Sequence, residues 1–323
     1  MRCIFNSSTD AYFNLAVEEF LLKNLEDNVF MLWKNEPSVI VGRFQNSLAE
    51  INLDYVNEKD IKVVRRLTGG GAVFHDFGNL NFTFIDNQGQ GDFRTFTQPI
   101  LELLRSLGVD ARFEGRNDLM IDGQKFSGNA QCKHGKRVMH HGTLLFSTEM
   151  TDLSEALKVN PLKFVDKAVK SVRKRVTNIS SHLPKPLSVD QFADLLMNYI
   201  LQTRSNSYLQ PFTPEEITQI KLLRDNKYST WNWNFGTSPR YDFSKIVRTK
   251  GGNLEVHLQI EKGVIEAVKI FGDFFAFKDI SELENCLIHT PHEKNSVSNL
   301  LKSIEVEKYL LNISVEEFVD ALF

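Results

Sequence analysis

Apolar residues near the start of the chain follow a helical pattern. Phe13, Val17, Phe20 and Leu21 are spaced so that they share one face of a helix. The pattern predicts an amphipathic helix that begins just after Asp10.

Short β-rich runs follow this helix. They cover residues 29–33, 38–42, 61–64, 80–85 and 138–146. In the run 80–85, polar Asn81 and Thr83 alternate with apolar neighbours, which predicts a half-buried strand.

A second helix and a hairpin are predicted between these runs. The helix starts near Thr95, and Pro99 is tolerated there if it lies in or near the first turn. Its apolar side is formed by Phe96, Ile100, Leu103, Leu104 and Leu107. After residues 119–121, Asp122-Gly123 favours a type I′ turn that leads into Lys125.

Helical signals dominate beyond residue 150. Capping boxes are predicted at Ser188 with Gln191, Thr213 with Glu216, and Ser314 with Glu317. Residues 231–241 are rich in turn formers and break both periodicities, and β-rich runs restart at 244–248, 254–261 and 264–271. We therefore predict an α+β catalytic domain over residues 1–243 and a small α+β domain over residues 244–323.

Composition and charge exclude several classes of protein. The formal net charge is −3, from 38 basic and 41 acidic side chains, which is not the basic footprint of a nucleic-acid binder. The chain has no apolar run that resembles a signal peptide or could span a bilayer. Cys3, Cys132 and Cys286 are far apart and form no CxxC pair, which fits a reducing compartment. We expect a cytoplasmic protein that binds neither nucleic acid nor membrane.

Three consecutive glycines, residues 69–71, are the most informative local feature. A bare triplet is typical of a tight turn, but here Arg65 and Arg66 precede it and Thr68 adjoins it. Guanidinium groups and backbone N–H groups together favour an anion site. The spacing matches neither a P-loop nor a dinucleotide fingerprint, because a strand follows instead of a helix.

Lys125 lies in a hairpin, where a lysine is typically an exposed surface residue. The small, polar residues 127–129 after it would let a ligand approach the backbone. Asn117 and Asp118 form an oxygen pair suited to Mg²⁺, although Asp118 could equally cap a turn.

Three other groups of residues are candidates for chemistry. His140 and His141 lack a third zinc ligand and point to opposite faces of a strand, so we expect one in the core and one at the site. His75 could pair with Asp76 as a base and its orienter, or both could belong to a turn. Cys132 could be an acyl-accepting nucleophile or an ordinary free thiol.

The order of these motifs resembles the bacterial lipoate–protein ligase A family. The resemblance rests on residues 65–76 (RRLTGGGAVFHD), 78–84 (GNLNFTF), 115–118 (GRND), 125–128 (KFSG) and 140–145 (HHGTLL). It extends to residues 8–19, 32–46, 171–178 and 231–239, and so covers nearly the whole chain.

The resemblance implies the fold, the reaction and the site. The fold would be a mixed-sheet, biotin/lipoate-ligase-like catalytic domain with an α+β accessory domain. Lipoate would attack the α-phosphorus of ATP with Mg²⁺ present, and a protein lysine would then attack the lipoyl-AMP. Lys125 would be catalytic and Asp118 the metal ligand. By the resemblance, Arg66, residues 71–74 and Lys125 bind the nucleotide. With the candidates from the residues themselves, the predicted binding residues are Arg66, Gly70, Gly71, Ala72, Val73, Phe74, Asn79, Asn117, Asp118, Lys125 and His141.

The implied acceptors are lipoyl domains of 2-oxoacid dehydrogenase E2 subunits or the glycine-cleavage H-protein, with the ligase a monomer. Leu67 and Phe126 depart from the family pattern, which leaves open a preference for lipoate or octanoate. Two alternatives stay open. One is an octanoyl or lipoyl transferase acting through a cysteine thioester, although Cys132 follows the lysine motif instead of preceding it. The other is a non-catalytic lipoate-binding homologue.

Overall fold

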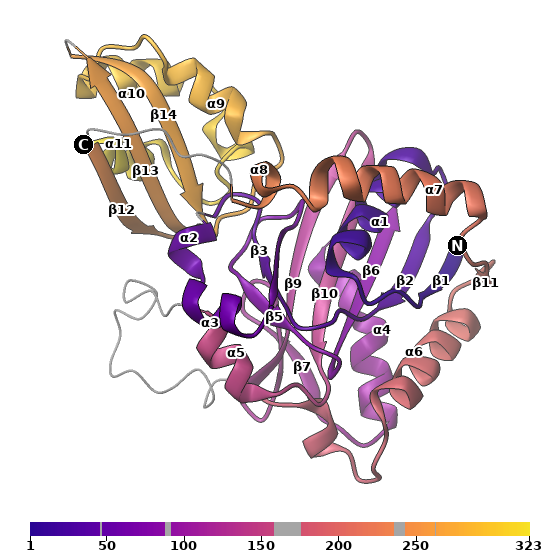
Figure 1. Cartoon of the computed structure of the whole chain (residues 1–323). Coiled ribbons are helices and arrows are strands. Elements are labelled where there is room, and N and C mark those ends of the chain that lie inside the picture. Colours follow the sequence, from indigo (N-terminus) through magenta and orange to yellow (C-terminus); the bar gives the residue numbers. More distant parts are fainter. Residues whose placement is uncertain (46, 88–91, 158–175, 236–242, 262) are drawn as a thin grey trace.

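The computed structural model describes residues 1–323 except 46, 88–91, 158–175, 236–242 and 262 (Figure 1). Parts of two motifs, 171–175 and 236–239, therefore lie outside the described residues. Eight strands form one mixed sheet in the order β11-β1-β2-β6-β10-β9-β8-β7. These strands are β1 (Arg2–Asn6), β2 (Val29–Trp33), β6 (Asn79–Asp86), β7 (Ala111–Glu114), β8 (Asp118–Ile121), β9 (Gln124–His134), β10 (Arg137–Leu145) and β11 (Tyr208–Leu209).

A second, three-stranded sheet carries the glycine motif. Its order is β4-β3-β5, with β3 at Ser38–Val41, β4 at Lys62–Arg65 and β5 at Val73–His75. Strand β3 is parallel to β4 and antiparallel to β5. Residues 66–72, called the glycine loop below, therefore cross the end of β3 to connect its two neighbours.

Helices cover both faces of the large sheet (Figure 1). Alternate residues of β2 point to opposite faces: Phe30 and Leu32 pack in one core with helices α4 (Phe93–Ser106) and α6 (Val189–Thr203). Val29, Met31 and Trp33 pack in the other core with helices α1 (Ala11–Asn24) and α7 (Pro214–Leu223). The remaining helices of this region are α2 (Ser47–Glu50), α3 (Leu53–Glu58), α5 (Met150–Ala156), η3 (Ile179–His182), η4 (Arg224–Tyr228) and α8 (Trp231–Asn234).

The local signals of the sequence are largely confirmed. Asp10 caps α1 through the Tyr12 amide, and all three capping boxes form. Asp122 and Gly123 have φ of 50° and 73°, as a type I′ turn requires. Residues 231–234, predicted to be part of a turn-rich segment, instead form α8.

Two elements are more buried than predicted. Helix α1 is buried on nearly every side, including Asn14, Glu18 and Glu19, and β6 is buried along almost its whole length. The polar side chains that suggested an exposed face are hydrogen-bonded inside the protein: Trp33 Nε1 donates to Thr83 Oγ1, which donates to Glu18. The prediction that β6 is half-buried was therefore wrong, because buried partners, in place of water, form the hydrogen bonds of its polar side chains.

Pro99 also lies deeper in its helix than predicted. Helix α4 begins at Phe93, so Pro99 falls in the second turn instead of the first. A proline there leaves the Thr95 carbonyl without its usual helical donor, and Arg204 Nη2 approaches this carbonyl at 3.5 Å.

The C-terminal strands form a separate antiparallel sheet in the order β12-β13-β14. They span Phe243–Thr249, Gly252–Glu261 and Val264–Gly272, and are followed by α9 (Ile280–Leu287), α10 (Lys294–Lys302), η5 (Val306–Lys308) and α11 (Val315–Leu322). Leu254, Val256 and Leu258 of β13 pack in a core of their own with these helices. The division into domains at residue 243 stays a prediction.

Residues that flank the C-terminal strands contact the glycine loop and its neighbours directly. Gly70 N–H donates to the Phe274 carbonyl at 3.4 Å, and the Phe274 ring stacks on Phe44 with centroids 4.9 Å apart. Arg116 donates to the Gly251 carbonyl at 2.8 Å and lies over the Phe275 ring. Residues 251, 274 and 275 thus meet residues from the first half of the chain beside the loop.

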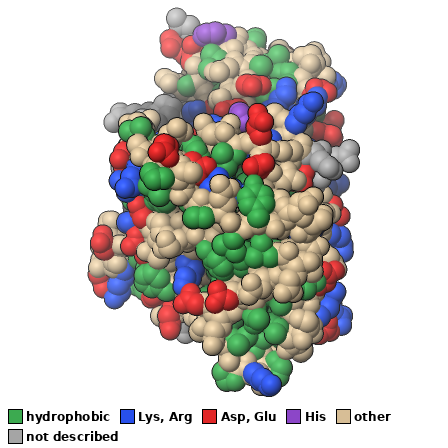
Figure 2. Space-filling model, turned by 90° about the vertical axis from the view of Figure 1, so that its right-hand side faces the viewer, with side chains coloured by type: hydrophobic (Ala, Val, Ile, Leu, Met, Phe, Trp, Pro, Cys, Tyr) green, Lys and Arg blue, Asp and Glu red, His purple; other side chains and the backbone are tan. Residues whose placement is uncertain are grey.

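Exposed apolar side chains occur on the side formed by β1, β11, α6 and α7. Phe5, Tyr208, Leu209, Leu195 and Leu222 are exposed there. Figure 2, which views the molecule from this direction, shows acidic and basic side chains interspersed around apolar ones. None of the described helices is long and apolar enough to cross a membrane.

Candidate functional site

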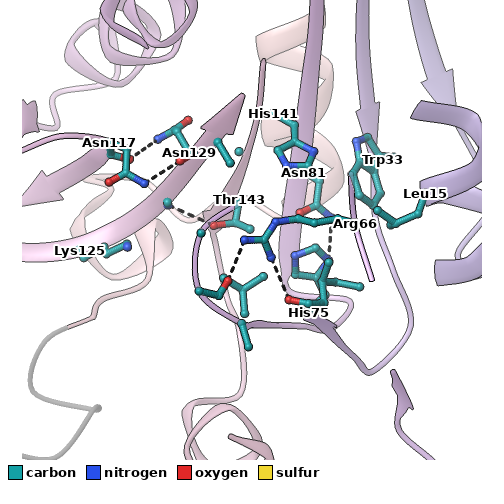
Figure 3. Close-up of a pocket in the computed structure, with 18 residues that line it drawn as sticks. Leu15, Trp33, Arg66, His75, Asn81, Asn117, Lys125, Asn129, His141 and Thr143 are labelled. Carbon is teal, nitrogen blue, oxygen red and sulfur yellow. Dashed lines mark hydrogen bonds between the residues drawn. The ribbon is translucent and has the colours of Figure 1, made fainter. Parts of the chain in front are cut away.

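A cavity lies where the large sheet, the small sheet and the glycine loop meet (Figure 3). It is lined by Leu15, Trp33, Ile40, Arg66, Gly70, Gly71, Ala72, Val73, His75, Asn81, Asn117, Lys125, Gly128, Asn129, Ala130, His141, Gly142 and Thr143. Lys125 lies on one side of the cavity, and Trp33 and Leu15 lie on the opposite side (Figure 3). The cavity thus has a polar side and a side with apolar walls.

Arg66 holds the glycine loop from inside. Its Nη2 donates to the carbonyls of Gly69 and Gly71, both at 2.8 Å, and its Nη1 donates to the Ile40 carbonyl at 3.0 Å. Its Nε donates to Thr68 Oγ1 at 2.9 Å. Burial lowers the pKa of Arg66 to about 10, so the guanidinium stays charged at neutral pH. The loop therefore folds around a fixed positive charge.

The backbone of the loop depends on its glycines. Gly70 has φ of +93°, a conformation that side chains disfavour. Gly42, on the segment after β3, lies so close to the Gly70 carbonyl that a Cβ there would clash with it. Glycine at residue 42 therefore keeps the loop in place from outside.

Arg65 does not join Arg66 at the cavity. Its guanidinium donates to backbone carbonyls of Gly42, Gln45 and Asn234 and to Ser47 Oγ. The prediction that both guanidinium groups converge on one anion was therefore wrong. Successive side chains of an extended segment point to opposite faces, so Arg65, the last residue of β4, faces α8 while Arg66, directly after it, faces the loop.

A buried hydrogen-bonded chain connects helix α1 to the loop. Glu18 accepts from His141 Nδ1 at 2.9 Å, and His141 Nε2 lies 2.8 Å from Thr68 Oγ1. Thr68 in turn accepts from Arg66. The orientation of the Arg66 guanidinium is thus supported from the core of the protein.

Lys125 forms an ion pair with Asp118, with Nζ and Oδ1 2.8 Å apart. The two side chains are 37% and 36% exposed, so both are accessible to a ligand. The main chain at Lys125 is fixed from a distant segment, because Thr177 N–H donates to its carbonyl at 2.9 Å. Next to Asp118, the side chain of Asn117 is held in place, because its Nδ2 donates to the Asn129 carbonyl at 2.7 Å.

The two strand histidines separate as predicted. His140 is fully buried, with Gln131 at its Nδ1 and Asn129 at its Nε2, while His141 lines the cavity. Burial lowers the pKa of His140 well below its usual value. His75 and Asp76 do not form a pair, because Asp76 accepts from the Gly78 and Glu149 amides and His75 contacts Asn35 and Asn81.

Eight of the eleven residues proposed from the sequence line the cavity. They are Arg66, Gly70, Gly71, Ala72, Val73, Asn117, Lys125 and His141. Phe74 instead packs in the core beside β3 and β4, and Asn79 Nδ2 donates to Asn81 behind the cavity wall. Asp118 is not among the lining residues, but it forms an ion pair with Lys125 and pairs along the strand with Gly128, and both of these line the cavity. Ligand-binding roles for all eleven stay predictions.

Sequence reasoning missed the wall opposite Lys125. Leu15, Trp33 and Ile40 come from α1, β2 and β3, and each is an apolar residue within an ordinary helix or strand pattern. No local signal distinguishes a side chain that lines a cavity from one that fills a core. In the described part of the chain, no group of three or more His, Cys, Asp or Glu side chains could hold a metal ion.

The buried histidines predict lower stability in acid. Burial, with a smaller effect of Arg66, lowers the pKa of His75 from 6.5 to about 3. Between these two values the unfolded chain binds a proton that the folded chain does not, so the free energy of unfolding decreases as pH falls. The expected slope is about 1.4 kcal/mol per pH unit for each such histidine. Urea unfolding at pH 7.5, 6 and 5 measures this slope. His75→Gln should reduce the slope by the contribution of one histidine, and an unchanged slope would contradict the lowered pKa of His75.

Two family models match the chain. The lipoyl protein ligase A/B catalytic domain matches residues 10–201, and the bacterial lipoate protein ligase C-terminus matches residues 238–322. The lipoate–protein ligase of Bacillus subtilis is 40% identical over 321 residues, covering 97% of both chains. Lipoate–protein ligase 1 of Staphylococcus aureus is 41% identical over 320 residues, with the same coverage.

Solved structures of lipoate–protein ligases are similar in fold to this chain. P. falciparum LipL1 in complex with lipoate has a TM-score of 0.78 at 26% identity and covers 99% of this chain and 96% of its own. A lipoate–protein ligase A bound with ATP has a TM-score of 0.65 at 28% identity, covering 73% and 98%. The bipartite ligase of Thermoplasma acidophilum, studied with its E2 lipoyl domain, has a TM-score of 0.64 at 31% identity, covering 75% and 98%.

Proposed function

The chain belongs to the lipoate–protein ligase family, and from this membership we propose how it ligates lipoate with ATP. The reaction has two steps: the lipoate carboxylate displaces pyrophosphate from ATP, and a protein lysine then displaces AMP from the lipoyl adenylate. The observation that carries this proposal is the placement of Lys125. Its ammonium and the glycine loop held by Arg66 line a single cavity.

Lys125 is the catalytic group in this proposal. A carboxylate and a polyphosphate repel each other, and more negative charge develops on the phosphoryl oxygens in the transition state. An ammonium that contacts both the acyl and the α-phosphoryl oxygens offsets this repulsion in each step. The partial exposure of Lys125 allows it to exchange Asp118 for these substrate oxygens.

The glycine loop and Arg66 are the proposed cradle for the reacting groups. Small residues at 69–72 let a ligand approach the main chain, and Arg66 supplies positive charge behind it. The apolar side of lipoate would follow the wall formed by Leu15, Trp33 and Ile40. Such enclosure would also shield the acyl adenylate from hydrolysis.

Asp118 and Asn117 are the proposed magnesium ligands. Their carboxylate and amide oxygens are hard donors, and one carboxylate with substrate phosphates is a typical Mg²⁺ environment. Because Asn117 Nδ2 donates to the Asn129 carbonyl, its Oδ1 remains available as a donor atom. Bound Mg²⁺ would neutralise charge on the polyphosphate.

The proposed acceptor is a lipoyl domain. The Thermoplasma acidophilum relative was studied with its E2 lipoyl domain, and the same chemistry would serve the H-protein of glycine cleavage. We place the reaction in the cytoplasm and propose a monomeric enzyme. Three free thiols, on Cys3, Cys132 and Cys286, are compatible with a reducing compartment.

A thioester route through Cys132 is disfavoured by its surroundings. Burial raises the pKa of this thiol to about 12, so almost none is thiolate at neutral pH. Cys132 also lies seven residues from Lys125 along β9, which is roughly 23 Å of extended strand. We therefore expect Cys132→Ser to change the rate of lipoyl transfer by less than about twofold. Loss of transfer with unchanged adenylate formation would instead support the thioester route.

One incubation tests the proposed function. The protein with ATP, Mg²⁺ and free lipoate should release pyrophosphate and form lipoyl-AMP, detected by mass spectrometry. Addition of an unmodified lipoyl domain should then increase the mass of that domain by one lipoyl group. Lipoate binding without pyrophosphate release would favour a non-catalytic binding protein.

A further inference from the structure

His75 is a buried polar residue of the cavity wall that the proposed mechanism does not use. It ends strand β5, is only 3% exposed, and lines the cavity with its ring 6.0 Å from that of Trp33. It lies on the Trp33 side of the cavity, away from Lys125 (Figure 3). Its hydrogen bonds determine which ring nitrogen carries the proton.

A series of amides fixes the proton on Nε2. Asn14 Nδ2 donates to the carbonyls of Ser8 and Lys34, which sets the orientation of that amide. The same Nδ2 lies 2.8 Å from Asn35 Oδ1, so one of its two hydrogens is shared between two oxygens. An oxygen is favoured beside this donor over a second N–H group, which directs the Asn35 Nδ2 to His75 Nδ1, 3.0 Å away.

Asn81 supplies a second donor to the same nitrogen. Its Oδ1 accepts from Asn79 Nδ2, and its own Nδ2 lies 3.4 Å from His75 Nδ1. Two donors on Nδ1 make it an acceptor, so the neutral ring carries its hydrogen on Nε2. Burial lowers the pKa of His75 to about 3, which keeps the ring neutral at physiological pH.

The Nε2–H group has no acceptor among the described residues, although it is buried. An unpaired buried donor is unfavourable, and native proteins seldom retain one without a role. Because His75 lines the cavity, a ligand atom in the cavity can supply the missing acceptor.

We propose that His75 Nε2–H donates a hydrogen bond to a sulfur atom of the lipoyl dithiolane ring and so selects lipoate over plain alkanoates. The inference rests on the proposed function, in which the carboxylate lies beside Lys125. The acyl chain then points its far end toward Trp33 and His75. The dithiolane sulfurs are the only heteroatoms at that end of lipoate, so they are the acceptors that the ligand can offer.

A sulfur-free acid of the same shape would leave the donor unpaired. Sites built to hydrogen-bond a substrate discriminate against analogues that lack the bonding group, because the buried protein group is left unsatisfied. Since sulfur is a weak acceptor, we expect about tenfold tighter binding of lipoate than of the carbocyclic analogue.

The test compares lipoate with 5-cyclopentylpentanoate, in which methylene groups replace both sulfurs. Calorimetry with the full-length protein gives the ratio of the two dissociation constants. His75→Phe removes the donor and should bring the ratio near one, while His75→Gln keeps an N–H near the Nε2 position and should restore part of the preference. Nitrogen-15 NMR of the wild type should show the Nε2–H tautomer, with a shift on lipoate but not on the analogue.

Two outcomes overturn the inference. Equal binding of both acids by the wild type would do so without any variant, and so would an undiminished preference in folded His75→Phe. If the wild type binds neither acid, the proposed function fails with it. If it binds both equally and still forms adenylates, only the role of His75 is lost.

Discussion

Replacing Lys125 with alanine should lower the rate of lipoyl-AMP formation by about 10²–10³-fold, the typical effect of removing one donor to developing charge. The side chain is partly exposed and its ion pair with Asp118 is accessible to solvent, so the folded structure should persist. Circular dichroism and the urea midpoint should therefore match the wild type. Mass spectrometry of the adenylate after incubation with ATP, Mg²⁺ and lipoate measures the loss.

Lys133 offers a matched control for this substitution. It belongs to the same strand, β9, but lies near the far end, where its ammonium is over the Phe277 ring instead of in the cavity. Lys133→Ala should therefore leave adenylate formation within about twofold of the wild type. Normal adenylate yield from Lys125→Ala would refute the central role given to Lys125.

Replacing Arg66 with methionine should lower the free energy of unfolding by about 3–5 kcal/mol, because a buried group with several partners is lost. The carbonyls of Ile40, Gly69 and Gly71 would lose their donor together. The loop should lose its conformation, and adenylate formation should fall even below the unfolding temperature. Urea denaturation at pH 7.5 measures the first effect.

Arg112 provides the comparison for Arg66. It is exposed and forms a surface ion pair with Asp110, so Arg112→Met should change the free energy of unfolding by less than about 0.5 kcal/mol. A similar small change for Arg66→Met would show that the loop does not depend on the guanidinium.

Local elements of this fold could be predicted because their signals are short in range. A capping box such as Thr213 with Glu216 satisfies backbone donors of its own helix, and Asp122-Gly123 adopts turn angles whatever surrounds it. The glycine motif and Lys125 could be identified for a similar reason: their composition is unusual for an ordinary strand or turn. In the structure these groups line one cavity.

Burial and orientation could not be predicted, since they depend on residues far away in the chain. Glu18 looks like the polar face of an amphipathic helix until His141 and Thr83 are brought to it. Arg65 and Arg66 look equivalent until β4 places them on opposite sides. The sequence pattern shows which positions are polar. It does not show whether water or a buried group of the protein forms their hydrogen bonds.

The contact between Phe274 and the glycine loop joins two parts of the protein that are also connected by the backbone. Phe274 meets Gly70 through a hydrogen bond and Phe44 through ring stacking, and both contacts are non-covalent. Because both surfaces belong to one chain, they stay at a high effective concentration whatever the dilution of the protein. If the backbone were cleaved between residues 235 and 243, the two fragments would have to find each other by diffusion, and occupancy of this contact would then rise and fall with protein concentration.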